Sequence, residues 1–413
     1  MWFYVQRILI PYEQADAVAH DRPRGNLSDL YPRWLGARAL LMDHRDPYSP
    51  QVTREIQQGY YGRALDPSRP EDPKDRQGFA YPVYVVFLLA PTVSMPFEVV
   101  EIMFRWLLVG LTAATVWMWL RVLGWRPHPA TTCILLVLTL GSFPAIQGFK
   151  LEQLSLLVCG LLAGCAMLVT SGYLALAGFV LALATIKPQL ALPFAGWLAV
   201  WAFADWKVRR MLIWGFVATI TALVAGGEFL LPGWVGRFRE AVAAYRQYTG
   251  GAGSALDVMI TPTTGKILTS LIVLGIITAC LLVRRHPAGS MPFVLVSSLV
   301  LAATVVTIPT FAPYNQLLLL PAIFLLLRNC EEIWQSGWAH RAAVIICFLT
   351  VGWPWLVAAS LTLVSAVLPV EKIESAWQLP LYTSLEIPIA VLALLAVYAR
   401  KRLTGQTARR LGE

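Results

Sequence analysis

Apolar runs long enough to cross a lipid bilayer recur from residue 98 to residue 400 of this 413-residue chain. A spanning helix needs about 20 apolar residues, and its backbone must satisfy its own hydrogen bonds within the hydrocarbon. Only 14% of the residues are charged, whereas soluble domains carry about 25%. The chain is therefore predicted to be an all-α, polytopic integral membrane protein without a large soluble domain.

About eleven spanning segments are expected in this apolar region. They are 98–121, 128–147, 152–171, 173–187, 188–204, 211–231, 262–283, 290–309, 313–328, 342–368 and 381–399. The clusters of Arg and Lys fall on one side if these helices alternate, and the positive-inside bias makes that side cytoplasmic. Residues 401–413 then form a basic cytoplasmic tail. The net charge of +9 follows from these loop cations, so no nucleic-acid partner is expected.

Two regions depart from simple alternation. Residues 79–97 are apolar enough to span, but they contain three prolines and would move every later cation cluster to the opposite side. A re-entrant segment is therefore expected there, within a membrane domain of residues 79–400. Residues 1–12 are apolar but rise only about 18 Å as a helix, so they are expected to be a stub of a truncated first spanning helix. Residues 13–78 are then the largest extracytoplasmic loop.

The stretch Asn26–Pro50 (NLSDLYPRWLGARALLMDHRDPYSP) is predicted to hold an amphipathic helix on the bilayer surface. Its apolar residues recur at i, i+4, i+7 and i+11, on one helix face: Leu30, Trp34, Ala37 and Leu41. Asp29 lies at the start of this helix, where a carboxylate is favoured as a cap. The alternative is that Asp29 is a general base at the membrane surface. A second polar helix is expected around Pro50–Arg63.

Other polar residues fall on the same predicted outer side. Lys187-Pro188-Gln189 separates two apolar runs, and a lysine near the membrane is expensive to bury. Lys187 either snorkels to the interface or holds a lipid phosphate, and Pro188 would present Lys187 and Gln189 outward. Gln153, at the head of the predicted segment 152–171, is a candidate for binding a sugar hydroxyl. Lys150 and Glu152, just before it, are expected to pair with each other in a surface turn.

The late stretch Thr310–Gln316 (TFAPYNQ) places three hydrogen-bonding side chains between two apolar runs. Tyr314, Asn315 and Gln316 suit sugar recognition, and an interfacial aromatic belt with neighbouring amides explains them equally well. At the start of the 98–121 segment, Glu101 and Arg105 stand at i and i+4 and are expected to pair.

Several chemical classes lack a signal in the sequence. No glycine-rich phosphate loop, no HExxH motif and no paired-cysteine motif is present. The six cysteines lie in or beside apolar runs without metal-ligand spacing, so they are expected to be packing residues. The acidic cluster around His44 is typical of a solvated surface. We therefore expect neither a metal nor a cofactor.

The order of short motifs resembles glycosyltransferase family 87, the mannosyltransferase-like branch of the GT-C superfamily. The motifs are Asp-Leu-Tyr at Asp29, Ala-Arg-Ala-Leu-Leu, Asp-Pro-Tyr, Tyr-Pro at Tyr81, Lys-Pro-Gln at Lys187, and Pro-Tyr-Asn-Gln followed by LLLLPAIFLLLR. The resemblance covers residues 29–328. Its specificity lies in the order and spacing of the motifs.

This resemblance implies a GT-C-like helical bundle with an active site at the outer face of the cell membrane. The donor would be a polyprenyl-phosphate sugar, with mannose as the expected sugar, and transfer to a lipid or glycan acceptor would invert the anomeric centre. Asp29 occupies the position of the family's catalytic base. Related enzymes have a histidine in the late motif where Tyr314 and Asn315 stand. Their full first spanning helix also has no counterpart in residues 1–12.

The predicted site then follows. Asp29 is the catalytic base, and Lys187 with Gln189 binds the donor phosphate. The sugar and acceptor would be bound by Tyr31, Arg33, Tyr81, Gln153, Tyr314, Asn315 and Gln316. Membrane lipids, the donor and the acceptor are the expected partners.

Other classes of membrane protein remain open at this point. A transporter or flippase for a lipid-linked or small polar substrate would also bury lysine and amides, although such proteins often show internal repeats. A polymer ligase should depend on a large outer loop late in the chain, whereas the largest loop here is early. A non-catalytic scaffold protein is a further alternative, but it would give no function to the large N-terminal loop or to Lys187.

Overall fold

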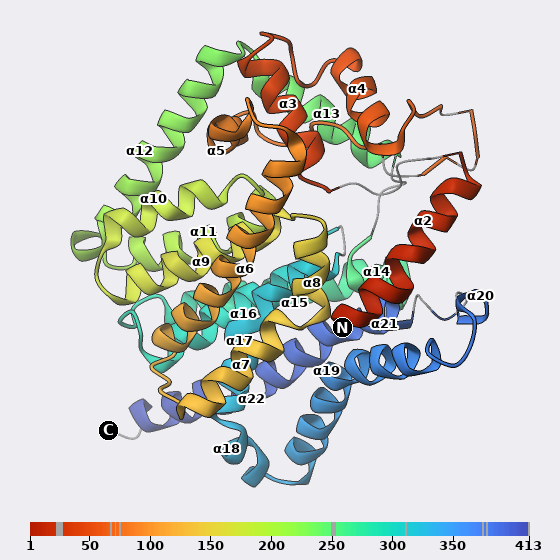
Figure 1. Cartoon of the computed structure of the whole chain (residues 1–413). Coiled ribbons are helices and arrows are strands. Elements are labelled where there is room, and N and C mark those ends of the chain that lie inside the picture. Colours follow the sequence, from red (N-terminus) through yellow and green to blue (C-terminus); the bar gives the residue numbers. More distant parts are fainter. Residues whose placement is uncertain are drawn as a thin grey trace.

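In the computed structural model the chain folds into one assembly of packed helices (Figure 1). The structure describes residues 1–21, 28–66, 68–70, 72–73, 76–248, 253–309, 312–373, 376 and 379–411. Parts of the predicted outer loops, residues 310–311 of the late polar stretch and the last two residues of the tail lie outside the described residues. The structure is 78% helical, and its described residues contain no strand. The predicted all-α fold is therefore confirmed.

Five stretches of the described chain are long and apolar enough to cross a membrane. They are α6 (Phe97–Val122), α12 (Trp206–Leu230), α15 (Pro262–Val283), α19 (Trp338–Val364) and Leu379–Arg402, which takes in α21 (Leu379–Thr383) and most of α22 (Glu386–Leu411). A sixth is added if α7 (Pro129–Leu140) and α8 (Phe143–Lys150), bent by 52°, form one span. These helices confirm a multi-pass membrane protein.

Shorter apolar helices complete the bundle. They are α9 (Leu154–Thr170), α10 (Leu174–Ala184), α11 (Pro188–Phe203), α16 (Met291–Thr307), and the 3₁₀ helix η3 (Pro313–Leu319) continued by α17 (Leu320–Arg328). The predicted spanning segments coincide with the long and short apolar helices. How many of them cross the bilayer stays a prediction.

Proline and polar caps set many of the helix starts. Pro129, Pro188 and Pro262 each open a helix, at a position whose N–H would have no partner within the helix. Thr261 accepts a hydrogen bond from the N–H of Thr264 and so caps α15. The break at Lys187-Pro188 therefore leaves Lys187 as the cap residue of α11.

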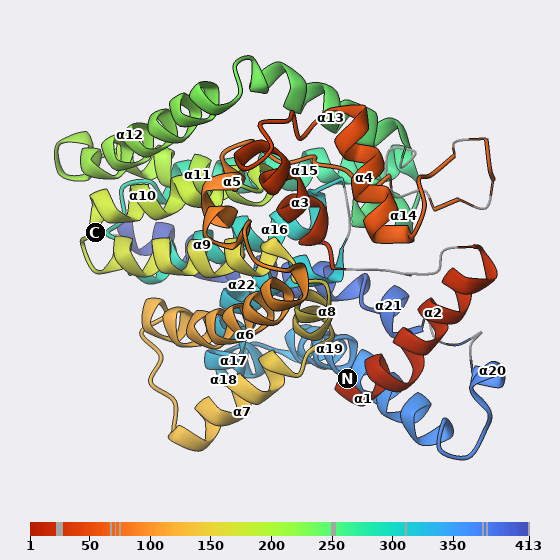
Figure 2. The same ribbon diagram turned by 45° about the horizontal axis from the view of Figure 1, so that its top comes forward.

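Helices form at both positions predicted for the outer loop, as α3 (Tyr31–Leu41) and α4 (Pro50–Tyr61), which contact each other at one end of the molecule (Figures 1 and 2). Their place on the bilayer surface stays a prediction. Beneath α3 the chain forms two short helices, α5 (Val85–Leu89) and the 3₁₀ helix η2 (Ala90–Thr92), and no spanning helix. The indole of Trp34 donates to the Thr92 carbonyl at 3.1 Å. Side chains of α3 thus satisfy irregular backbone that lipid could not satisfy.

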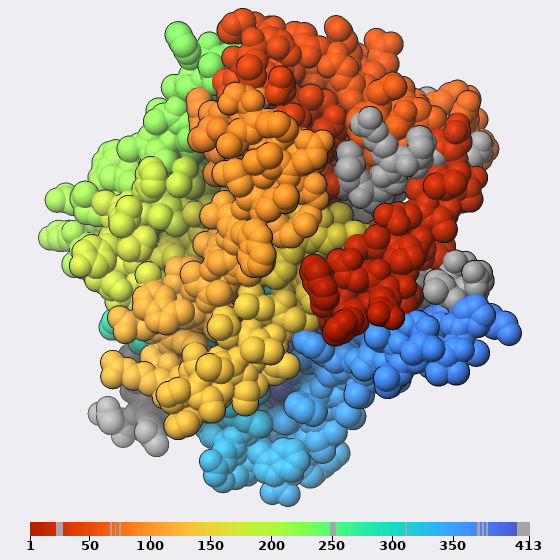
Figure 3. Space-filling view, in the orientation of Figure 1, coloured from red at the N-terminus to blue at the C-terminus, as the bar shows by residue number. Residues whose placement is uncertain are grey.

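The N-terminal segment is helical from Trp2 to Ala19, as α1 (Trp2–Tyr4), the π-helix η1 (Val5–Leu9) and α2 (Ile10–Ala19). It lies on the surface against α19 (Figure 3). Tyr4 and Ile8 are buried there in a small apolar cluster with Phe143 and Ala358. The remaining helices are α13 (Trp234–Tyr248), α14 (Ala255–Met259), α18 (Cys330–Gln335) and α20 (Val370–Ile373).

Two glycines let α10 and α12 pack backbone to backbone (Figure 2). A Cβ at Gly178 would lie 2.2 Å from the Leu212 carbonyl oxygen, and one at Gly215 would lie 2.2 Å from the Ala175 carbonyl oxygen. Small residues at helix contacts are the usual means of close association in membranes, where apolar side chains gain little by leaving lipid. This pair forms one flank of the bundle.

Candidate active site

A chain of hydrogen bonds joins Asp29 to Lys187 through Gln153. The Nε2 of Gln153 donates to Oδ2 of Asp29, and its Oε1 accepts from Nζ of Lys187 at 2.6 Å. Because a carboxylate only accepts and an ammonium only donates, this is the one orientation of the Gln153 amide that satisfies both neighbours. The two charged residues proposed from sequence are therefore linked by a residue that the sequence also selected.

The loop before α9 holds Asp29 in position. The backbone N–H of Asp29 donates to the Leu151 carbonyl at 2.9 Å, and Nη1 of Arg33 donates to the Asp29 carbonyl at 2.6 Å. The hydroxyl of Tyr60, on α4, lies 3.5 Å from Oδ1 of Asp29. Asp29 is half-buried, so its carboxylate can meet a substrate.

Asp29 does not cap α3. The cap residue of that helix is Leu30, which makes no side-chain cap bond, and the N–H of Leu30 donates to the Ser28 hydroxyl at 3.1 Å. The structure thus contradicts the helix-cap interpretation that the sequence favoured. The carboxylate of Asp29 instead faces side chains from other elements.

Lys187 is buried, with 7% of its surface exposed. Its Nζ donates to Ser155 Oγ at 2.7 Å as well as to Gln153, and it lies 5.3 Å from the ring centroid of Tyr314 and 5.7 Å from that of Tyr81. Within the described part of the chain, no carboxylate comes within ion-pair distance of it. Two of its three N–H donors are engaged, both by neutral groups.

A cation in this setting favours an anionic ligand. Burying an unpaired charge is costly, and dipoles and aromatic faces offset only part of that cost. An anion that entered would gain a strong Coulombic interaction, because little water competes with it. Lys187 therefore lacks the carboxylate partner expected of a purely structural buried lysine.

The late polar stretch reaches the same place through η3. The Ser155 hydroxyl donates to Oδ1 of Asn315 at 2.8 Å, so Asn315 and Tyr314 both border Lys187. Gln316 points elsewhere, because its Nε2 donates to the Ser384 carbonyl at 2.8 Å. Of the three predicted residues, Tyr314 and Asn315 thus lie at the network. Gln316 instead connects η3 to the turn between α21 and α22.

The other predicted residues also divide. Arg33 stacks over the ring of Tyr81, with its Cζ 4.6 Å from the ring centroid, so both residues border the network. Tyr31 packs edge-on against Phe97 at 4.9 Å between ring centroids, which is a packing contact between α3 and α6. Gln189 is exposed on the first turn of α11 and makes no described hydrogen bond to the network.

The sequence comparison agrees with this geometry. The sequence model of glycosyltransferase family 87 matches residues 79–310, which is more than half of the chain. The chain belongs to glycosyltransferase family 87. The resemblance drawn from the motifs is thereby confirmed, and the chain is a membrane glycosyltransferase. No curated protein matches it. Tyr81, Gln153 and Lys187 lie within the matched region, whereas Asp29 and Asn315 lie outside it.

In this family 87 glycosyltransferase an ion pair with one buried carboxylate lies beside the network. Glu152, in the turn between α8 and α9, is fully buried, and Arg105 donates to its Oε1 at 2.9 Å from Nε. Arg105 also pairs with Glu101 at 2.6 Å, as predicted. The predicted pairing of Lys150 with Glu152 is wrong, because Lys150 pairs with Glu13 of α2 and Glu152 turns inward.

Burial raises the pKa of the Glu152 carboxyl to about 7, and the Ser28 hydroxyl and the Arg105 guanidinium offset this only in part. Glu152 also has a positive φ of 43°, in the left-handed region that residues with side chains rarely adopt. This conformation directs Glu152 inward between Leu151, which accepts from Asp29, and Gln153. Glu152 is thus held beside Gln153 with its carboxylate bonded to Arg105.

Sequence reasoning missed Ser155, Tyr60 and Glu152. A signal existed for Ser155, since it follows Gln153 by two residues in the first turn of an otherwise apolar helix. Tyr60 and Glu152 gave no such signal, because their roles depend on contacts with Asp29 and Arg105 that are remote in sequence. The described residues contain no group of three or more His, Cys, Asp or Glu side chains that could hold a metal ion.

Proposed function

We propose that this glycosyltransferase moves a sugar, with mannose as the expected one, from a polyprenyl-phosphate donor to a hydroxyl of a lipid or glycan acceptor. The observation that supports this most is the hydrogen-bonded chain from Asp29 through Gln153 to Lys187. It holds a carboxylate and an unpaired ammonium in one network. These are the two groups that such a transfer needs at opposite ends of the reacting bond.

The proposed reaction is a single displacement. The acceptor oxygen forms a bond to the anomeric carbon while its proton passes to the carboxylate of Asp29. The bond between that carbon and the donor phosphate oxygen breaks, and the electron pair leaves with the polyprenyl phosphate. Attack from the face opposite the phosphate inverts the anomeric centre.

Lys187 is proposed to bind the donor phosphate. The leaving phosphate gains negative charge in the transition state, and an ammonium held beforehand by Gln153 and Ser155 stabilises that charge without rearranging. The ammonium supplies the charge that a metal ion supplies in other enzymes, so transfer is proposed to need no metal. Tyr81, Tyr314, Asn315 and Arg33 border this position and are the proposed sugar contacts.

A lipid-linked donor fits the position of the site in the bundle. Gln153 and Lys187 stand at the N-terminal ends of the apolar helices α9 and α11. Exposed cations such as Lys207 and Arg210 follow α11 at its far end, which the positive-inside bias assigns to the cytoplasm. We therefore place the reaction at the outer face of the cell membrane, where a polyprenyl phosphate can present its headgroup.

Donor turnover by the purified protein tests this function. The protein would be incubated in detergent with polyprenyl-phosphate-[¹⁴C]mannose and extracted envelope lipids, and the label followed by chromatography. Parallel reactions would contain polyprenyl-phosphate-glucose, GDP-mannose in place of the lipid donor, or EDTA. We expect label in a new product from the lipid-linked mannose, none from GDP-mannose, and no loss of activity with EDTA.

Each contrary result removes a defined part of the proposal. Turnover of GDP-mannose would replace the donor class, and inhibition by EDTA would remove the role given to Lys187 as the charge at the phosphate. Preference for the glucose donor would change only the sugar. An intact donor that instead crosses the bilayer of reconstituted vesicles would favour a flippase.

A further inference from the structure

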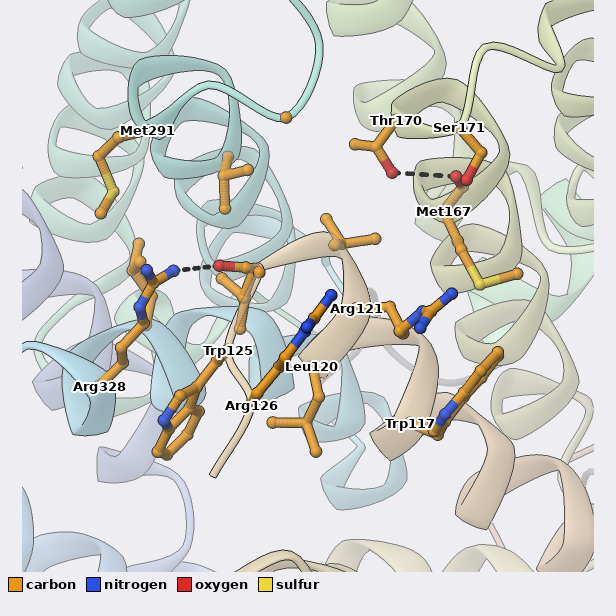
Figure 4. Close-up of a pocket in the computed structure, with 16 residues that line it drawn as sticks. Trp117, Leu120, Arg121, Trp125, Arg126, Met167, Thr170, Ser171, Met291 and Arg328 are labelled. Atoms are coloured by element: carbon orange, nitrogen blue, oxygen red, sulfur yellow. Dashed lines mark hydrogen bonds between the residues drawn. The ribbon is translucent and has the colours of Figure 1, made fainter. Parts of the chain in front are cut away.

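A cavity of about 650 Å³ lies at the far end of α9 from the candidate active site (Figure 4). It is bordered by the C-terminal ends of α6, α9 and α17 and by the N-terminal end of α16. None of the residues proposed for sugar transfer lines it. Its place at the cation-rich end of the bundle makes it a separate site.

The turn that ends α6 forms one wall of this cavity. The N–H of Gly124 donates to the Arg121 carbonyl and that of Trp125 to the Leu120 carbonyl, both at 3.0 Å. Gly124 has a φ of 58°, so these bonds are the pair of a Schellman motif. The motif keeps Arg121 in the last helical turn and brings Arg126 just beyond it, so that both arginines line the same cavity.

Three arginines and no carboxylate line the cavity: Arg121, Arg126 and Arg328. All three are exposed to solvent, and none has an ion pair within the described part of the chain. The guanidinium of Arg121 lies over the Trp117 ring, 5.3 Å from its centroid, and Nη1 of Arg328 donates to the Leu123 carbonyl. Arg126 stands between the other two in Figure 4.

The local charge stays positive after the helix ends are counted. The carbonyl ends of α6, α9 and α17 each bring about half a negative charge, and the amide end of α16 brings about half a positive one. Three full positive charges exceed this balance. The cavity is thus electropositive and open to water, and an anion would find guanidinium groups without competing carboxylates.

Some other cations on this side of the molecule are held by partners within the protein. Arg402 pairs with Glu332, and buried Arg209 donates to the carbonyls of Trp201 and Arg284, each at 2.8 Å. The positive-inside bias explains why arginines gather on one side of a membrane protein. It does not explain why three of them surround one cavity that no carboxylate lines.

We propose that this cavity binds the phosphate headgroup of an anionic phospholipid. A lipid fits better than free phosphate because apolar side chains of Leu120, Met167, Met291 and Val294 line the cavity beside the arginines. Trp117, 53% exposed on α6, is placed as an interfacial anchor beside the glycerol region. Basic pockets between spanning helices on the cytoplasmic side are known to hold anionic headgroups.

Lipid binding by the purified full-length protein tests the proposal. Native mass spectrometry would measure the binding of phosphatidylglycerol, with phosphatidylcholine as the neutral comparison and inorganic phosphate as a competitor. The variants are Arg126→Gln and Arg121→Gln, and Arg210→Gln is the matched control. Arg210 is an exposed arginine near the start of α12, on the same side, and does not line the cavity.

We expect phosphatidylglycerol to bind and phosphatidylcholine to bind weakly or not at all. Arg126→Gln and Arg121→Gln should each weaken phosphatidylglycerol binding roughly fivefold, the usual effect of one cation near a lipid surface, while Arg210→Gln leaves it unchanged. Arg126 makes no described contact that the fold needs, so its variant tests the site even if Arg121→Gln unfolds. Equal losses in Arg126→Gln and Arg210→Gln would overturn the proposal, as would displacement of the lipid by millimolar phosphate.

Discussion

At its N-terminal end α9 borders a closed network around one lysine, and at its C-terminal end it borders an open cavity with three arginines. The two ends lie roughly 25 Å apart along the helix axis. Lys187 is almost fully buried among amide, hydroxyl and aromatic groups, whereas Arg121, Arg126 and Arg328 are exposed. Both regions offer positive charge without a carboxylate partner. They differ in how much water competes for that charge.

This difference in solvation separates two uses of a cation. A buried ammonium with fixed partners can stabilise charge that develops at one atom, because nothing has to reorganise during the reaction. Exposed arginines hold a headgroup through several weaker interactions, which suits retention of a lipid better than catalysis. Substitutions near the N-terminal end of α9 should therefore lower activity. Substitutions near its C-terminal end should instead weaken lipid binding.

The largest effect is expected from Asp29→Asn. The amide keeps the shape of the side chain and can still accept from Gln153, but it cannot take the acceptor proton. We expect the rate of sugar transfer to fall about 10²–10⁴-fold while polyprenyl-phosphate binding and thermal stability stay near wild type. Asp43→Asn, which changes an exposed carboxylate paired with Arg45 in the same loop, is the control. Near-normal transfer by Asp29→Asn would remove Asp29 from the mechanism.

Lys187→Gln should have the next largest effect, mainly on the donor. A hydrogen bond to a charged group contributes about 1.5–3 kcal/mol, so affinity for polyprenyl phosphate should fall by about tenfold to 100-fold. Lys207→Gln, which changes an exposed lysine in the first turn of α12, should bind as wild type does. Tryptophan fluorescence titration with polyprenyl phosphate measures both. Equal affinities in the two variants would mean that burial does not distinguish Lys187 from a surface cation.

Local spacing allowed much of this architecture to be predicted from the sequence. Apolar run lengths predicted the helices of the bundle, and the i, i+4 rule predicted the Glu101–Arg105 pair. The same rule also explains a failure. Lys187 and Gln189 are two residues apart, and residues at that spacing face different sides of a helix, so Gln189 could not be expected to join Lys187 at the start of α11.

Contacts between distant segments could not be predicted in this way. Lys150 and Glu152 look like a self-contained ion pair in sequence, but the positive φ of Glu152 turns it toward Arg105, and Lys150 meets Glu13. Likewise, Gln153 was recognisable as polar at a helix start, yet its position between Asp29 and Lys187 depends on how the residues before α3 meet the turn before α9. The type of each residue indicated which interactions it could make. Its actual partners depended on how distant segments of the chain pack together.

A pH effect on stability is expected from Glu152. The pKa of its carboxyl is about 7 when folded and about 4.5 when unfolded, so the folded state binds more protons between these values. Stability should therefore fall as pH rises from about 4.5 to 7, by up to about 3 kcal/mol. Melting temperatures at pH 5 and pH 8 should differ more in wild type than in Glu152→Gln. Glu98→Gln, at an exposed glutamate of α6, should behave as wild type, and parallel curves for Glu152→Gln would contradict the burial argument.

The smallest effect is expected from Ser155→Ala, which tests whether neutral partners position the buried lysine. The Ser155 hydroxyl accepts from Lys187 and donates to Asn315, so its loss frees the ammonium on one side. A hydrogen bond of this kind contributes about 1 kcal/mol, and we expect the KM for the donor to rise roughly fivefold with kcat less affected. Ser298→Ala removes an equally buried hydroxyl that bonds only within α16 and should leave KM unchanged. If both variants keep the wild-type KM, Lys187 does not depend on its neutral partners, and the contrast between the two ends of α9 reduces to burial alone.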